Sequence, residues 1–540
     1  MAVALDLADI QGNVLSAYGK LGFPKGRFIT LNITDPAAGR KFVNALLPGI
    51  TTALRWPSPR TKLQPGVVPV PKPDVAVNIA FSFSGLLALG ISNRTLRGLP
   101  DEFIDGMMKR APMLGDNFDG TDLATAWDEV WTAAKGAHLA PKVVHMLVTL
   151  NAQMNSDGTP MAALDAKTRE IEALCQSLGG GVQILPGHNR PGQPSAPYQE
   201  LSAIMMRGPD GKVMPLPKEH FGYTDALGDP VFEGEFPGNE ERHDERGNGA
   251  VDGAGNWRPL AIGEFLLGYP DEAQEIAGAA MPLDFSRNGT FMAYRKRHQN
   301  VAMFRKFLSD TAAQFGTVYG INNPDDARET LMAKIAGRWS DGVPLARAKN
   351  VAEWREFNAQ FRPFSPEWLQ AVIDFKYKDD PNGFKCPVTS HLRRVNTRDG
   401  LAPTKTEGSV LNNRRRILRR GLPYGDSSQD VPDSSEHGIV MLVVCASLFR
   451  QYEFVQQQWL NYGLDANSGN DTCPLVGNHA SGKDGQPKAK FVIASDPATG
   501  RPPFVVEGLP QFVETRGGEY FFVPSMTALR MIGMGVVDPT

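Results

Sequence analysis

The amino-acid sequence predicts an α+β protein made of two ferredoxin-like sandwiches, each an antiparallel sheet with both helices on one face. The first reason is length, because 540 residues are too many for one ordinary hydrophobic core and two core-forming units are expected. The second reason is that one order of strand-like and helix-like segments occurs twice along the chain.

The first copy begins with a strand and a helix. Residues 26–34 alternate as a strand, and Asp35 and Pro36 offer an N-cap and a first-turn proline for a helix through about Leu47. Residues 74–83 place their apolar side chains on one face, which is the period-two pattern of a half-buried strand. The remaining elements of this copy are a strand at 142–151, a helix at 165–178 and a strand at 182–185.

The later part of the chain repeats this order. Its predicted elements are a strand at 289–295, a helix at 300–315, a strand at 438–446, a helix at 448–462 and a strand at 518–523. Between the copies, residues 208–256 are rich in glycine, proline and charge, which predicts a linker and loop. Loops held between rigid sheets often carry function. We therefore expect an N-terminal domain over 1–215 and a C-terminal domain over 216–540.

The composition argues against several classes of protein. Fifty-six basic and 59 acidic residues give a net charge of -3, which provides no general field to attract nucleic acid. The longest strongly apolar stretch, 439–446, is far shorter than the roughly 20 residues that span a bilayer. The N-terminus carries Asp6 and Asp9 and no basic residue before Lys20, so it shows no export signal and we expect a cytoplasmic location. Packaging, or export without such a signal, stays open.

His391 is the histidine that suggests a cofactor. It lies in PNGFKCPVTSHLRRVNTRD, where Arg393, Arg394 and Arg398 follow it closely. Cations so near a histidine suit an anionic cofactor, and a haem brings both two propionates and an iron that takes one imidazole. The other eight histidines need no special account. We therefore predict His391 as an axial ligand of haem iron.

Cys386 offers an alternative ligand. The four cysteines lie far apart and form no CxxC pair, so neither a disulfide framework nor a zinc site is expected. Cys386 is close enough to His391 to bind iron as a thiolate, as in some haem oxygenases. Its other interpretation is a small buried residue beside a proline.

Two further segments could face a cofactor. Asp225 lies in the glycine-rich EHFGYTDALGDPVFEG, although an aspartate in such a loop often bonds its own backbone, as expected at Asp229. NNRRRILRRGLPYG has five arginines in seven positions, which also suits a solvated basic face or a nucleic-acid patch. Ile417 and Leu418 are apolar and favour an inward direction for Arg419.

Taken together, these segments resemble the dye-decolorising peroxidase family of haem enzymes. Further stretches in the family's order are DIQGNVL near the start, GEFLLGYPDE (263–272), RNGTFMAYRKRHQNV (287–301), AGRWSDGVPL (336–345), RQYEFVQQQW (450–459) and RGGEYFFVPSMTAL (516–529). The resemblance covers the N-terminal tag and most of 215–530, while 95–200 shares only a compatible element order. It implies the dimeric α+β barrel type of fold, with haem between the sheets and held mainly by the second unit.

The resemblance also implies roles for single residues. Asp225 matches the distal aspartate of the family's GxxDG motif, with Ala226 in place of the final glycine, and Arg419 matches the distal arginine. His391 matches the proximal histidine. The implied reaction reduces hydrogen peroxide through an oxo-ferryl intermediate, with Asp225 moving the proton and Arg419 steadying negative charge. An aspartate pKa of about 3.9 would favour acid conditions unless burial raises it.

Two supporting residues follow from the same resemblance. Arg394 is similar to a partner of a haem propionate, and Glu453 to the carboxylate that hydrogen-bonds the proximal imidazole. The cofactor would be haem b with one iron per chain, and the partners hydrogen peroxide and bulky organic donors such as dyes and phenolics. The chain would be a monomer or a dimer.

Two other functions stay open at this stage. One is a haem carrier or sensor without turnover, in which Asp225 only closes a turn. The other is a thiolate haem oxygenase acting through Cys386. Surface aromatic residues could pass electrons from bulky donors, but Trp339, Trp354, Trp368 and Trp459 are each more typical of a core or interface, and none is assigned as a relay.

Overall fold

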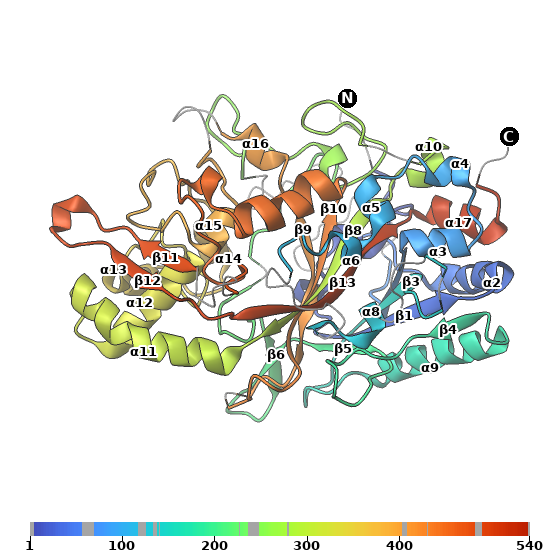
Figure 1. The fold of residues 1–540 in the computed structure, drawn as a ribbon, viewed down its shortest axis with the longest axis horizontal. Helices are drawn as coiled ribbons and strands as arrows, with labels where there is room; N and C mark the ends of the chain where they lie inside the picture. The colour runs from blue at the N-terminus through green and yellow to red at the C-terminus, as the bar shows by residue number, and fades with distance from the viewer. Residues whose placement is uncertain are drawn as a thin grey trace.

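A single large antiparallel sheet organises the protein (Figure 1). The computed structural model describes residues 5–56, 70–116, 126–132, 138–139, 141–225, 227–235, 248–277, 280–401, 408–428, 430–480 and 489–537. Within these residues the sheet has nine strands in the order β4-β1-β3-β2-β13-β8-β10-β9, and the ninth, β5, pairs with β1. The order contains two sets of four strands placed side by side, which matches the predicted α+β class.

The first set has the order β4-β1-β3-β2 of a ferredoxin-like unit. Its elements are β1 (Lys25–Ile33), α2 (Pro36–Leu46), β2 (Val75–Phe81), β3 (Met146–Ala152), α9 (Ala162–Ser177) and β4 (Val182–Ile184). The helix start was predicted correctly, because the Asp35 carboxylate accepts the backbone N–H groups of Ala37 and Ala38, each at 3.1 Å. All six elements lie within a few residues of their predicted ranges.

Strand β2 differs from its prediction in burial. The alternating pattern predicted a strand with one wet face, yet every residue of β2 after Val75 is buried. One face contributes to the main hydrophobic core, and the other carries Ala76 and Asn78 beneath the N-terminal segment, where Tyr18 bonds Asn78 at 3.1 Å. The prediction of a half-buried strand was wrong because neighbouring chain covers the second face.

The second set has the order β13-β8-β10-β9, which repeats the arrangement of the first. Its elements are β8 (Thr290–Gln299), α11 (Val301–Tyr319), β9 (Leu418–Gly425), β10 (His437–Cys445), the π-helical segments η4 (Leu448–Glu453) and η5 (Val455–Leu460), and β13 (Val513–Val523). The two sets join where Phe522 of β13 pairs with Phe81 of β2. The second predicted unit is therefore present, with longer strands β8 and β13 than expected.

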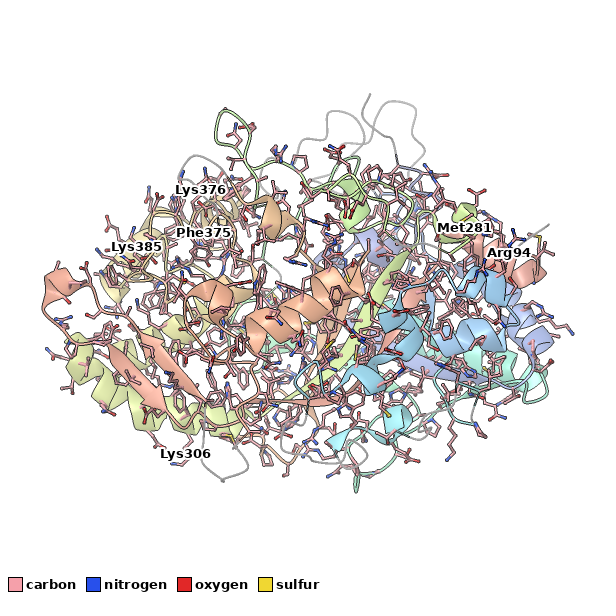
Figure 2. All side chains as sticks on the ribbon, turned by 45° about the horizontal axis from the view of Figure 1, so that its top comes forward. Arg94, Met281, Lys306, Phe375, Lys376 and Lys385 are labelled. Carbon is pink, nitrogen blue, oxygen red and sulfur yellow. The ribbon has the colours of Figure 1, made fainter. Side chains whose placement is uncertain are left out.

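Long connections distinguish the second set from the first. Between Tyr319 and Leu418 the chain forms α12 (Pro324–Ala336), α13 (Val351–Gln360), α14 (Pro366–Ile373), α15 (His391–Val395) and α16 (Val410–Asn413). In Figure 2, Phe375, Lys376 and Lys385 of this connection lie at one end of the molecule and Arg94 lies at the other. Before β13 come η6 (Leu464–Ala466), β11 (Lys490–Ile493), η7 (Pro497–Thr499) and β12 (Phe504–Glu507).

The remaining elements are short and mostly surround the first set. They are α1 (Gly12–Leu15), η1 (Tyr18–Leu21), η2 (Leu47–Gly49), α3 (Phe83–Ala88), α4 (Asn93–Leu96), α5 (Asp101–Asp105), α6 (Met107–Arg110), α8 (Glu129–Thr132), β5 (Gln199–Ser202), β6 (Ile204–Arg207), β7 (Val213–Leu216), η3 (Ile262–Glu264), α10 (Leu283–Ser286) and α17 (Met526–Met534). The C-terminal α17 packs on α2, where Asn44 bonds the Gly533 carbonyl at 2.8 Å. The domain limits 1–215 and 216–540 stay a prediction, with the boundary inside β7.

Strand β8 carries an unusual run of buried polar side chains. Arg295, Lys296, Arg297 and His298 are all less than a tenth exposed. Burying a charge is costly unless it is paired, and the Arg295 and Lys296 side chains each meet a buried aspartate at 2.6 Å, Asp116 and Asp128 respectively. These partners come from the first half of the chain, so the ion pairs bind the two halves together.

None of the described helices combines the length and the apolar character that a membrane span requires.

Candidate active site

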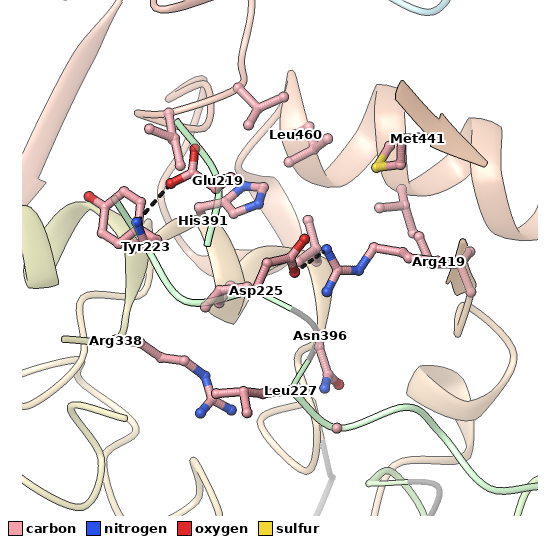
Figure 3. Close-up of a pocket in the computed structure, with 18 of the residues that line it drawn as sticks. Glu219, Tyr223, Asp225, Leu227, Arg338, His391, Asn396, Arg419, Met441 and Leu460 are labelled. Atoms are coloured by element: carbon pink, nitrogen blue, oxygen red, sulfur yellow. Dashed lines mark hydrogen bonds and ion pairs between the residues drawn. The ribbon is translucent and has the colours of Figure 1, made fainter. Parts of the chain in front are cut away.

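A large pocket lies against the second set of strands (Figure 3). Its apolar wall is formed by Leu227, Phe375, Ile417, Ile439, Met441, Val455, Leu460, Leu475 and Val476. All of its lining residues fall between Glu219 and Val513, so none comes from the first set of strands. The pocket therefore belongs to the second unit and to its long connections, and the expectation of a haem between the sheets, held mainly by the second unit, stays a prediction.

Asp225 and Arg419 face each other inside this pocket. The Arg419 Nη1 atom lies 2.8 Å from Asp225 Oδ1, and Figure 3 shows this ion pair as a dashed line. The side chains remain 39% and 42% accessible although the surrounding protein encloses them, because they open into the cavity. The Asp225 carboxylate raises the pKa of Arg419 against the effect of burial, so the arginine stays charged.

The loop before Asp225 is held by Glu219. The Glu219 carboxylate accepts the backbone N–H groups of Phe221 at 2.9 Å and Tyr223 at 2.8 Å, and Gln299 of β8 donates to it as well. Gly222 has φ +100°, a conformation that favours glycine. Burial raises the pKa of Glu219 to about 7, despite those hydrogen bonds. The loop from Glu219 to Asp225, called the distal loop below, thus has a fixed shape and carries a second carboxyl group besides that of Asp225.

The turn around Ser340 anchors the same loop from outside. The Ser340 carbonyl accepts the backbone N–H of Thr224 at 3.0 Å, its hydroxyl at 2.9 Å and the Lys218 ammonium at 2.9 Å. Tyr223 donates its hydroxyl to the Met332 carbonyl of α12 at 2.8 Å. The stretch that follows α12 therefore contributes to the site by positioning Asp225. Ala226, the predicted departure from the motif, lies outside the described residues.

His391 also lines the pocket and is the first residue of α15. Its Nδ1 atom lies 3.2 Å from the sulfur of Cys473, a cysteine in the connection before β13. Burial opposes ionisation of this thiol, but the charge and hydrogen bond of His391 outweigh burial and lower the Cys473 pKa to about 7. Nε2 makes no hydrogen bond to the described residues and is the nitrogen available to a ligand in the cavity.

Glu453 does not contact His391, so its predicted role is wrong. Its carboxylate accepts two hydrogen bonds from Arg110, both at 2.6 Å, and one from the Tyr520 hydroxyl at 2.8 Å. The side chain is 1% exposed and does not line the pocket. The irregular π-helical turns of η4 direct it toward the first half of the molecule. Cys473 occupies the position beside the imidazole that we expected a carboxylate to fill.

Arg394 is also placed differently from its prediction. It points away from the lining residues and donates to the Asp471 carbonyl. Besides Arg419, four arginines line the cavity, namely Arg297, Arg338, Arg398 and Arg416. Only Arg398 was singled out by sequence, through its closeness to His391.

Cys386 lies outside the pocket lining. It is fully buried in the cluster around Trp339 and Trp368, and burial raises its thiol pKa. Its backbone N–H donates to Asp380 Oδ2 at 2.9 Å. The interpretation as a small buried residue is supported, and the thiolate ligand is not.

The arginine-rich segment forms internal contacts rather than a solvated basic face. Arg416 and Arg419 line the pocket, and Arg420 donates to the carbonyls of Asn13 and Val14, each at 3.1 Å. Arg415 lies 3.6 Å over the Phe454 ring. The strand alternation of β9 sends Arg419 and Arg420 to opposite faces, so neighbouring arginines have different roles.

Comparisons with known proteins agree with this geometry. The family model described as the DyP dimeric alpha+beta barrel domain matches residues 9–191. Peroxidase 2 of Mycetinis scorodonius is 26% identical over 98% of this chain and 88% of its own. A dye-decolorizing peroxidase of Mycena epipterygia is 24% identical over 98% and 87%. A solved structure of an ancestral D-type dye decolorizing peroxidase has a TM-score of 0.70 at 26% identity and covers 98% of this chain and 99% of its own.

The chain is thus similar to dye-decolorising peroxidases over nearly its whole length, and its residues 9–191 match the family's barrel domain. Both the α+β barrel class and the similarity over nearly the whole length follow the resemblance seen in the sequence motifs. The family model and the motifs support each other, because the model matches the first half whereas most of the motifs lie in the second.

The pocket of this chain fits a haem. Its described lining carries five arginines but only three carboxyl groups, so positive charge is in excess. Arg416 Nη1 is buried and has no hydrogen-bond partner among the described residues, and burial lowers the pKa of this guanidinium to about 10. Burial likewise lowers the pKa of Arg398 to about 9. Two propionates would compensate these charges, while the apolar wall suits a porphyrin ring and His391 supplies an imidazole.

Trp339, Trp354, Trp368 and Trp459, the tryptophans considered as electron relays, have structural contacts. Trp339 lines the pocket and stacks on Trp354, with ring centroids 4.7 Å apart and planes 2° from parallel. Their indole N–H groups bond the Ala348 carbonyl and the Asp341 carboxylate, both at 2.8 Å. Trp368 bonds Asn358 at 3.3 Å and Trp459 bonds Asp465 at 3.0 Å.

Proposed function

We propose that this chain is a haem peroxidase that uses hydrogen peroxide to oxidise organic donors such as dyes and phenolics. The observation that carries the proposal is that the His391 imidazole and the Asp225–Arg419 ion pair open into one pocket. An acid–base carboxylate, a fixed cation and an iron ligand are the groups that peroxide reduction needs. The cofactor we propose is haem b, one per chain.

His391 would hold the iron through Nε2, while Arg338, Arg398 and Arg416 would bind the propionates. The bound haem supplies the iron at which peroxide is reduced by two electrons. The apolar wall would exclude water from the ring. The chain's own residues thus fix the position and the charge of the cofactor.

Asp225 would accept the proton of the incoming peroxide and return it to the departing oxygen. Arg419 holds the carboxylate in the cavity, since its Nη1 lies 2.8 Å from Asp225 Oδ1. Arginine remains protonated, so it cannot take the proton and instead stabilises negative charge that develops on the oxygen. Glu219 holds the shape of the loop through its two backbone hydrogen bonds.

If the chain were only a haem carrier or sensor, Asp225 would be expected to form hydrogen bonds only within its own turn. The ion pair to Arg419 on β9 and the opening of both side chains into the cavity favour catalysis instead. The relatives' names also support turnover with dyes.

The test is to load the purified chain with haem, mix it with hydrogen peroxide and follow the haem spectrum together with consumption of a dye. Asp225→Asn should slow the peroxide step by about 10²–10⁴-fold, since it removes the proton acceptor but keeps the side-chain shape. Asp210→Asn, in the exposed turn between β6 and β7, is the matched control and should keep the wild-type rate. Haem binding without peroxide reaction or dye consumption would establish the carrier instead.

A further inference from the structure

The proximal side of the pocket contains a sulfur where a carboxylate was expected. Cys473 Sγ lies 3.2 Å from His391 Nδ1, and the cysteine is fully buried. We propose that Cys473 is the hydrogen-bond acceptor that orients His391 and sets the electron density which its imidazole gives to iron. This inference rests on the proposed function, because it requires haem bound at His391. Cys473 is a positioning residue, as it acts through the histidine.

The backbone around Cys473 is well fixed. Its N–H donates to the Leu460 carbonyl at 2.6 Å, and its own carbonyl accepts the Gly477 N–H at 3.0 Å and contacts His479 Nε2 at 2.8 Å. A Cβ at Gly477 would lie 2.6 Å from that carbonyl oxygen, so the turn depends on glycine there. The sulfur is therefore presented to His391 by a tightly packed segment. A chance contact of a mobile side chain would lack these constraints.

No nearby carboxylate takes this position among the described residues. Glu453 is bound to Arg110 and Tyr520. Asp471, two residues before Cys473, has its Oδ1 3.5 Å from the Lys490 ammonium, while its carbonyl accepts Arg394. The His391 Nδ1–H thus has the sulfur as its acceptor.

A sulfur acceptor should have a different effect from a carboxylate. A carboxylate that accepts the imidazole N–H makes the ligand more basic and strengthens its donation to the metal. A thiol sulfur is a weak acceptor, so the N–H proton stays more firmly on the ring. The imidazole of this chain should then donate less than a carboxylate-bonded one and more than one with no acceptor.

The experiment compares haem-loaded wild type with Cys473→Ala, Cys473→Ser and Cys473→Asp at one mildly acidic pH. The readouts are the iron(III)/iron(II) midpoint potential and the iron–histidine stretching frequency of the ferrous protein. We expect the potential to rise from Asp to wild type to Ala, and the stretching frequency to fall in the same order. The serine variant should stay near wild type, since its hydroxyl also accepts.

Cys175→Ala is the matched control, because it removes a buried cysteine of α9 in the first half and should shift neither readout. If the alanine variant does not fold, the serine and aspartate variants still carry the comparison. Wild-type values equal to those of Cys473→Ala, or equal to those of Cys473→Asp, would overturn the inference while leaving the peroxidase intact. A wild type without a histidine-ligated haem spectrum would instead refute the proposed function.

Discussion

The two halves of the sheet share a strand order but differ in what they bury. Strands β2 and β3 of the first half bury apolar side chains on the main core, such as Ile79, Leu147 and Val148. Strand β8 of the second half buries Arg295 and Arg297 at equivalent depth. Apolar burial needs no specific partner, whereas each buried guanidinium needs one. The same topology thus serves as a scaffold in one half and as the wall of a site in the other.

The second half becomes a site because of its long connections. The chain from Tyr319 to Leu418 brings His391 and three cavity-facing arginines to the sheet, and the segment before β13 brings Cys473. In the first half, by contrast, the corresponding connection from α2 to β2 runs only from Leu46 to Val75. Rigid strands with variable connections are a common way to build a site on an existing fold. Substitutions in each half can test this difference in role.

His391→Ala should show the largest difference between the two halves, because it should impair haem binding by the second half and leave the first half intact. It removes the proposed iron ligand from the second half, so haem affinity should fall by about 100-fold or more and dye oxidation with it. The first half should be unaffected, because no described residue before Glu219 lines the pocket. Titration with haem, followed at the Soret band, measures the loss. Cys386→Ala is the control, and a Soret band lost there but kept in His391→Ala would revive the thiolate ligand.

Arg419→Leu tests whether the charge in the pocket is catalytic. It should slow the peroxide step by about 10²–10³-fold, because one fixed donor to the developing charge is lost. Haem affinity should change much less than in His391→Ala. Stopped-flow mixing with peroxide gives the rate, and Arg414→Leu, from the same arginine-rich segment but outside the pocket lining, is the control. An unchanged rate in Arg419→Leu would exclude this residue from the reaction.

Asp116→Asn and Leu147→Ala compare the two kinds of burial directly. Asp116→Asn weakens the buried pair with Arg295 and should cost about 3–5 kcal/mol of unfolding free energy. Leu147→Ala leaves a cavity in β3 and should cost about 2–5 kcal/mol. Only the first should also weaken haem binding, since Arg297 lines the pocket and lies 4.0 Å from Asp116. Denaturant unfolding measures the loss of stability, and haem titration measures the affinity for haem. Equal haem affinity in the two variants would contradict the proposed difference between the two halves.

Glu219→Gln should have the smallest effect, a change in the stability of the fold that depends on pH. Burial raises the Glu219 pKa from 4.5 to about 7, so its contribution to stability is complete below about pH 4.5 and is lost as pH rises through 7. The variant should therefore gain about 1–2 kcal/mol relative to wild type across this window. Thermal melts at several pH values measure the gain.

Glu519→Gln is the matched control for that experiment. Burial raises the Glu519 pKa to about 7 as well, but Glu519 lies on β13 away from the pocket lining. Both variants should show the same trend in stability. Only Glu219→Gln should also shift the pH profile of dye oxidation, because the Glu219 carboxylate holds the backbone of the loop that contains Asp225. A shift of the profile in both variants would mean that the effect is not local to the distal loop.

The class of the fold and the family resemblance could be predicted from the sequence, whereas strand β9 was not predicted. Alternation and helix caps are local, so the first helix and most strands could be located from residues such as Asp35 and Pro36. His391, Asp225 and Arg419 were found through motifs, and all three line one pocket. Their catalytic roles stay predictions.

The tertiary structure decided which neighbours those residues have. Glu453 and Arg394 lie close in sequence to the elements of the site, yet side-chain direction turns both away from the pocket. Cys473 gave no signal, since 82 positions separate it from His391 and no motif joins them. Contacts between distant segments depend on how loops pack against the sheet. Local sequence patterns carry no information about that packing, so the acceptor beside the proximal histidine could only be found in three dimensions.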